Sequence, residues 1–80
     1  MGSKEMFEKL GYYLLFDASE LSYRADINDK DYIQIIFHKN SKNWHIIKVI
    51  DNGDYSIVYP VSMQLQKAIN KQIEELGWIK

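Results

Sequence analysis

The sequence predicts an α+β fold, in which a short N-terminal helix, a five-stranded antiparallel β-meander and a C-terminal amphipathic helix form one domain over residues 1–80. Apolar residues recur at helical spacing near both ends of the chain. Between these ends they alternate with a period of two and are rich in β-branched and aromatic types. The polar separators are too short for crossover helices, so consecutive strands should pair antiparallel.

The first helix is predicted over about residues 4–10, where Met6, Phe7 and Leu10 fall on one helical face. Ser3 is available as its N-cap. However, residues 1–3 resemble a cloning remnant that precedes the native start, so we base no functional inference on them.

Both helices are predicted to end at a glycine. A Leu-Gly-aromatic sequence occurs twice, with the glycine at Gly11 and again at Gly77. Glycine takes the left-handed conformation at the C′ position of a Schellman motif without the steric cost of a Cβ atom. The aromatic residue that follows, Tyr12 or Trp78, should then pack on the residue five positions before it.

The C-terminal helix is predicted to begin after the lone proline, Pro60, with Ser62 as its N-cap. Its polar face carries both Lys and Glu, unlike the basic face of a membrane-surface helix. We therefore expect it to pack on one face of the sheet through an apolar stripe formed by Leu65, Ala68, Ile69, Ile73 and Leu76.

Five strands are expected between the helices, over residues 12–16, 21–25, 32–38, 44–50 and 55–59. The turn before the last strand leaves two alternatives. A two-residue type I′ turn at Asn52-Gly53 would leave Ile57 outside the core, whereas a four-residue loop would place it inside. We favour the longer loop because it keeps Ile57 away from water.

The alternation within the middle strands indicates which residues share a face. The apolar core face is assigned to Ile33, Ile35, Phe37, Ile47 and Val49. This assignment puts Ile36, Trp44 and Ile46 on the face opposite the helices. Three large apolar side chains are more than a solvated sheet face needs, so these three residues are the predicted partner-binding site.

Composition restricts the class of protein. A hydrophobic content of 46% is too high for a disordered tail, and a formal charge of −1 lacks the positive field of a nonspecific nucleic-acid binder. Without cysteine there is no thiolate nucleophile, no disulfide and no Cys-type zinc site. The longest apolar run, residues 12–16, is far too short to span a bilayer. We expect a cytoplasmic protein with no membrane contact.

One local cluster merits a chemical interpretation. His38, Lys39, Lys42 and His45 surround the third turn beside Trp44, a mixture that could bind phosphates or stacked bases. A zinc site needs a third ligand that this segment lacks, so no metal site is predicted. The serines and acidic turns match no nucleophile or calcium motif, so neither catalytic residues nor cofactors are expected.

Both ends of the chain resemble known sequences. Residues 6–12, Met-Phe-Glu-Lys-Leu-Gly-Tyr, and residues 65–78, from Leu65 to Trp78, resemble the ends of short uncharacterised proteins encoded by phages and prophages of Gram-positive bacteria. In the middle of the chain only the strand pattern is similar. The resemblance implies a genomic setting and assigns no functional residue.

The function predicted from these observations is a nonenzymatic binding or regulatory domain that acts through protein–protein contacts, with self-association as the simplest form. The alternative is a nucleic-acid-associated factor that uses the turn from His38 to His45. An enzyme with a small site ranks third.

Overall fold

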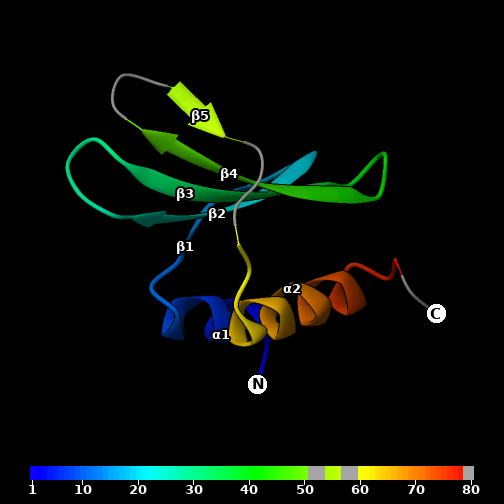
Figure 1. Cartoon of the computed structure of the whole chain (residues 1–80). Coiled ribbons are helices and arrows are strands. Elements are labelled where there is room, and N and C mark those ends of the chain that lie inside the picture. Colours follow the sequence, from blue (N-terminus) through cyan, green and yellow to red (C-terminus); the bar gives the residue numbers. More distant parts are fainter. Residues whose placement is uncertain (51–53, 57–59, 79–80) are drawn as a thin grey trace.

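The computed structural model describes residues 1–50, 54–56 and 60–78, and places both helices on one face of an antiparallel sheet (Figure 1). In chain order the elements are α1 (Ser3–Lys9), β1 (Tyr13–Asp17), β2 (Glu20–Asp26), β3 (Tyr32–His38), β4 (Asn43–Ile50), β5 (Asp54–Ser56) and α2 (Met63–Glu75).

The sheet is a meander in which neighbouring strands follow one another in the order β1-β2-β3-β4-β5. The α+β class, the antiparallel pairing and the two terminal helices are as predicted. Five full strands are not matched, because only β1 to β4 reach five to eight residues in the described chain and β5 has three. Residues 57–59 of the predicted last strand, and turn residues 51–53 with their two alternatives, lie outside the described residues.

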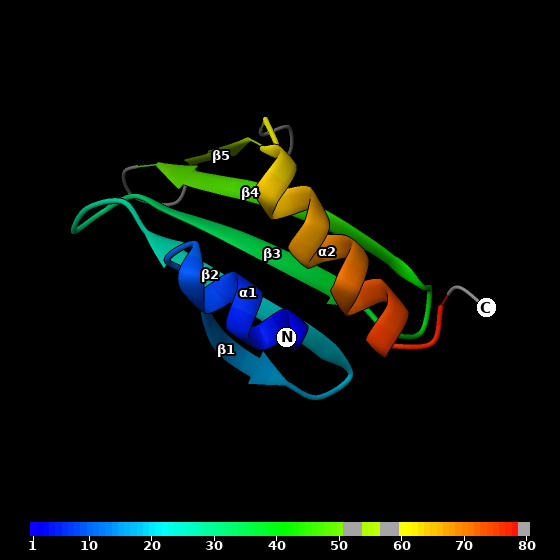
Figure 2. The ribbon, with the colours of Figure 1, turned by 90° about the horizontal axis from the view of Figure 1, so that it is seen from below.

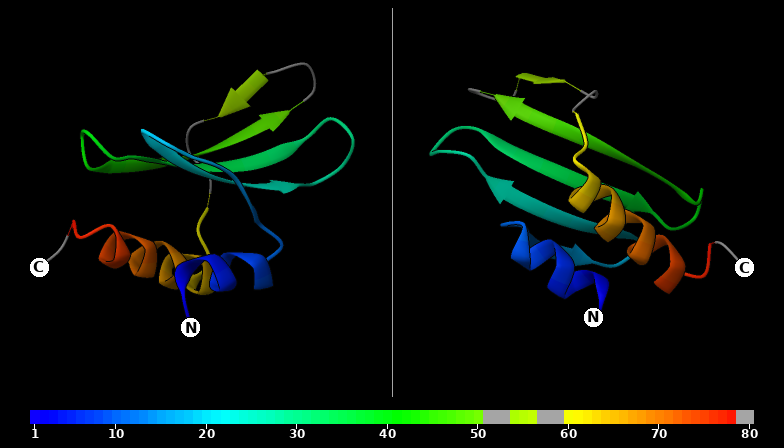
Figure 3. Two further views of the ribbon diagram at one scale, coloured as in Figure 1. Left: turned by 180° about the vertical axis from the view of Figure 1, so that it is seen from behind. Right: turned by 60° about the horizontal axis from the view of Figure 1, so that its bottom comes forward.

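The helices form a second layer below the sheet. Seen from below, α1 lies across β1 and β2 while α2 runs diagonally across β3 and β4 (Figure 2). Two further views show the other sheet face turned away from both helices (Figure 3). The core between the layers is centred on Phe7, Ile35, Phe37, Ala68 and Ile69, all fully buried.

Both helix ends have the predicted Schellman geometry. Gly11 and Gly77 have φ angles of +92° and +76°, and the amides of Tyr12 and Trp78 donate to carbonyl oxygens five residues earlier. Tyr12 packs edge-on against Phe7, with ring centroids 6.1 Å apart. Because the Tyr12 amide is used in this cap, β1 begins one residue later than predicted.

The N-terminal caps are partly as predicted. Ser62 caps α2, since its side chain accepts a hydrogen bond of 3.1 Å from the amide of Leu65. At α1 the predicted cap is wrong, because Gly2 is the N-cap and Ser3 is already the first helical residue. The Ser3 side chain is instead buried between α1 and α2, so Ser3 forms part of the packed structure.

The predicted face of Trp44 and Ile46 is wrong. Trp44 pairs with Phe37 and Ile46 pairs with Ile35, so Trp44 and Ile46 point toward the helices. Ile46 is 4% exposed, and Trp44 packs against the core. The third turn has four residues rather than five, because His38 already pairs with the residue before Trp44. A shift of one residue moves every side chain of a strand to the opposite face.

Candidate functional site

The uncovered face of the sheet is organised in rows that cross the strands. One row runs from Phe16 of β1 through Ser22 and Ile36 to His45 of β4. Phe16 is 42% exposed, and Ile36 is half-buried although neither helix lies over it. Of the three predicted partner-binding residues, Ile36 therefore remains on the uncovered face.

The next two rows continue this mixed surface along the strands. Tyr13, Arg24, Gln34 and Ile47 form the second row, and Asp26, Tyr32 and Val49 form the third. Ile47 and Val49, which were assigned to the helix-facing core by their alternation, thus share the face of Ile36, although Val49 is itself buried with 8% of its surface exposed. Aliphatic side chains from β3 and β4 consequently form a continuous patch on a face that the helices do not cover.

Charged groups on this face are balanced within it. The Arg24 guanidinium lies 2.9 Å from the Asp26 carboxylate and 3.8 Å from the centre of the Tyr32 ring. The hydrogen bond with Asp26 raises the pKa of Arg24, so this side chain stays charged. The Tyr13 hydroxyl also donates to Asp26, over 3.2 Å. These exposed contacts add little stability, but they leave no large net charge around the aliphatic patch.

A carboxylate and two histidines form a chain of contacts at one end of the face. Glu20 Oε2 lies 2.5 Å from Nδ1 of His38, and Nε2 of His38 lies 3.1 Å from Nδ1 of His45. The two imidazole rings are stacked with centroids 4.8 Å apart. Partial burial lowers the pKa of His45, and the neighbouring His38 lowers it further.

The geometry of the contacts between Glu20, His38 and His45 fits proton sharing better than metal binding. Since the two ring nitrogens of His38 face Glu20 and His45 separately, the three groups do not converge on one point. In the part of the chain that the structure describes, no group of three His, Cys, Asp or Glu side chains could hold a metal ion. The two histidines approach each other across the hairpin between β3 and β4.

The predicted anion-binding cluster is only partly assembled. His38 and His45 meet, but Lys39 forms an ion pair of 2.6 Å with Asp17. Lys42 is exposed in the turn, with a φ angle of +57°. A hollow of about 230 Å³ beside His38 and Lys39 is also lined by Glu20. Because carboxylates lie next to the basic groups, the cluster offers less positive charge than the sequence indicates.

A buried polar junction joins the helices to the sheet, and sequence reasoning missed it. The hydroxyls of Ser3 and Tyr23 both lie 2.8 Å from the side-chain oxygen of Gln72, and the Ser3 hydroxyl also donates to Glu75. The hydrogen bond from Ser3 lowers the pKa of Glu75, whereas burial raises the pKa of Tyr23. The available signal was the position of Gln72, one turn before Leu76 on the apolar stripe of α2.

Comparison with known proteins gave no family model, no curated protein and no solved structure that matches this chain. Within the described residues, neither helix is long and apolar enough to cross a membrane.

Proposed function

We propose that this protein is a small nonenzymatic binding domain that acts through protein–protein contacts, and that the uncovered sheet face is its contact surface. The observation that carries the proposal is the aliphatic patch on the face turned away from both helices, where Ile36 and Ile47 are half-buried and Val49 is 8% exposed. A partly exposed apolar patch bordered by polar groups is typical of interaction sites on small proteins.

The partner that this surface fits most simply is a second copy of the chain. Its charges are paired locally, as in Arg24 with Asp26 and Glu20 with His38, so two copies of the face can approach without strong repulsion. The net charge of −1 likewise opposes association very little. A symmetric contact places the same patch on both sides of the interface.

The resemblance of both chain ends to phage and prophage proteins supports a phage origin as part of the same proposal. We infer a cytoplasmic location from the composition, which includes no cysteine.

The test is sedimentation velocity over a concentration series with a matched pair of variants. Ile36→Lys places a charge in the centre of the patch, and Ile27→Lys makes the same change at an exposed residue in the turn after β2. The wild type and Ile27→Lys should gain mass with concentration, whereas Ile36→Lys should stay near 9.5 kDa. Loss of a central anchor commonly costs about 2 kcal/mol, roughly a thirty-fold change in Kd.

Far-ultraviolet circular dichroism of both variants establishes that each is folded before association is compared. A wild type that remains monomeric up to millimolar concentration would contradict self-association. Equal loss of association in Ile36→Lys and Ile27→Lys would contradict the assignment of the contact to the uncovered face.

A further inference from the structure

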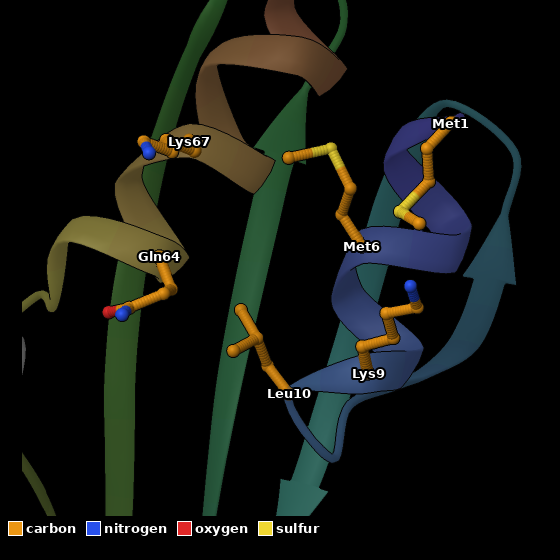
Figure 4. A pocket seen from close by; sticks show the side chains of 6 residues that line it. All are labelled: Met1, Met6, Lys9, Leu10, Gln64 and Lys67. Atoms are coloured by element: carbon orange, nitrogen blue, oxygen red, sulfur yellow. The ribbon is translucent and has the colours of Figure 1, made fainter.

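A second surface lies on the helical layer, between α1 and α2. Met6, Lys9 and Leu10 line one wall of a hollow of about 220 Å³, and Gln64 and Lys67 of α2 line the other. Figure 4 shows Met6 and Leu10 pointing from the first helix toward the second, with the strands behind them. The hollow is therefore separate from the uncovered sheet face.

The hollow exists because an apolar edge of one helix faces a polar edge of the other. Met6 and Leu10 lie one turn apart and share a side of α1, while Phe7 between them turns into the core. Opposite them, α2 presents Gln64 and Lys67 rather than apolar partners. Leu10 consequently remains 37% exposed, and the flexible thioether of Met6 can adapt to an added side chain.

Two amines flank this apolar floor, one from each helix. Lys9 and Lys67 are both exposed, and among the described residues neither takes part in an ion pair or a hydrogen bond. The charged side chains that line the hollow are both lysines, whereas Glu5 and Glu8 of α1 are not among the residues that line it. The rim is thus positive although the whole chain carries a formal charge of −1.

We propose that this groove binds an acidic amphipathic segment of a partner protein. A bulky apolar side chain of the segment would rest on Met6 and Leu10, and flanking carboxylates would meet Lys9 and Lys67. This is the way in which amphipathic helices occupy grooves between helices, with apolar anchors in the groove and charges at its rim.

The size of the groove favours a peptide over a small-molecule ligand. Pockets for cofactors and drug-sized molecules usually hold about 300–1,000 Å³, and this groove holds about 220 Å³. That volume suits one or two side chains of a longer segment, whose remaining contacts lie along the helix surfaces. The proposal is independent of the self-association assigned to the sheet.

The probe for the test is a synthetic helical peptide with Leu at two positions one turn apart and Glu on both sides of them. Binding is measured by fluorescence anisotropy at low salt, with the methyl signals of [methyl-¹³C]methionine recorded in parallel by NMR. We expect the Met6 methyl signal to shift on titration and the affinity to fall as salt is added.

Four variants locate the site. Leu10→Ser should weaken peptide binding about ten-fold by removing apolar contact, and Lys67→Glu should weaken it by a similar factor through charge repulsion. Lys42→Glu makes the same charge change in the turn between β3 and β4 and should have no effect. The double variant Lys9→Glu plus Lys67→Glu should instead prefer a peptide in which Lys replaces Glu.

Several outcomes would overturn the proposal. The acidic peptide could bind no better than its Lys counterpart, Lys42→Glu could be as harmful as Lys67→Glu, or the Met6 signal could stay unchanged. Binding of dodecanoate with no binding of the peptide would also overturn it, because the groove would then take a long-chain carboxylate. Sedimentation of the free chain is a separate readout, so this proposal and the proposed function can fail independently.

Discussion

Replacing Gln72 by Leu should destabilise the fold, although Leu suits an apolar stripe better than Gln. In the native chain the Tyr23 hydroxyl lies 2.8 Å from the Gln72 side-chain oxygen, and the Tyr23 side chain is only 2% exposed. Gln72→Leu removes one of the two side-chain partners of that hydroxyl and leaves it with the Ser3 hydroxyl alone. The Ser3 hydroxyl keeps its hydrogen bond to Glu75, so the cost falls on Tyr23.

The magnitude follows from the loss of one hydrogen bond by a buried hydroxyl that keeps Ser3 as a second partner, about 1–1.5 kcal/mol. This is a substantial part of the total stability of an 80-residue chain, roughly 4–12 kcal/mol. Tyr23→Phe removes the hydroxyl itself and leaves Gln72 with Ser3, so it should cost less, about 0.5–1 kcal/mol. In the double variant both polar partners are gone, so the loss should be smaller than the sum of the two single losses.

The assay is urea unfolding of the four proteins at 25 °C, followed by circular dichroism and analysed as a double-mutant cycle. The expected coupling between Gln72 and Tyr23 is about 1 kcal/mol or more, with unchanged m-values. If Gln72→Leu were neutral or stabilising, or if the two losses were additive, the buried junction would not stabilise the fold as argued.

Three further predictions concern the helix end, the histidines and the corrected sheet face. Gly77→Ala should lower the free energy of unfolding by about 1 kcal/mol, because Ala resists a φ angle of +76° and its Cβ would gain no contact; Gly77→Asn, which tolerates the left-handed conformation better, is the control that should cost less in the same urea titration. The pKa of His45 is lowered in the folded protein, so the unfolded chain binds a proton at this residue first as the pH falls below about 6.5. Stability should therefore fall between pH 7 and pH 5, which is measured as a decrease in the urea midpoint. The decrease should be less steep in His45→Gln. Trp44→Ala should destabilise folding by roughly 2–4 kcal/mol because Trp44 packs against the core. Sedimentation of its folded fraction should show unchanged self-association. Intact folding with lost association would instead support the sequence-based placement of Trp44 on the face opposite the helices.

Much of the fold could be predicted because local patterns determined it. The left-handed glycines, the Ser62 cap and the period-two alternation each depend on a few neighbouring residues, and the structure shows each of them. The range of β3, 32–38, agrees at both ends because its alternation is regular and its flanking turns are polar. Local signals of this kind survive tertiary packing.

The face of β4 could not be predicted because that strand is apolar on both sides. Trp44 and Ile46 alternate with His45 and Ile47, so hydrophobicity alone does not identify the core side. The decision depended on the length of the third turn, where Lys42 adopts a left-handed conformation and its amide donates to the carbonyl of His38 over 2.9 Å. An error of one residue in the predicted length of that turn therefore placed Trp44 and Ile46 on the wrong face of the sheet.

The polar junction and the groove were missed for a different reason. Both arise where α1 meets α2, and the contact between Ser3 and Gln72 joins positions 69 residues apart in the chain. No periodic pattern reports a contact of that kind. The charge of the cluster at the third turn was mispredicted for the same reason. Lys39 forms an ion pair with Asp17, which lies at the far end of three neighbouring strands, so the residues around the turn do not predict this contact.

The most direct test of the central claim, that the uncovered sheet face is a contact surface between copies, is site-specific photocrosslinking. Benzoylphenylalanine is placed at Ile36 on that face, or at Asn70 on the exposed side of α2 as the matched control. Irradiation at a concentration above the association midpoint should give a covalent dimer from position 36 and little from position 70. Equal yields from both positions, or a dimer from position 70 alone, would contradict the account.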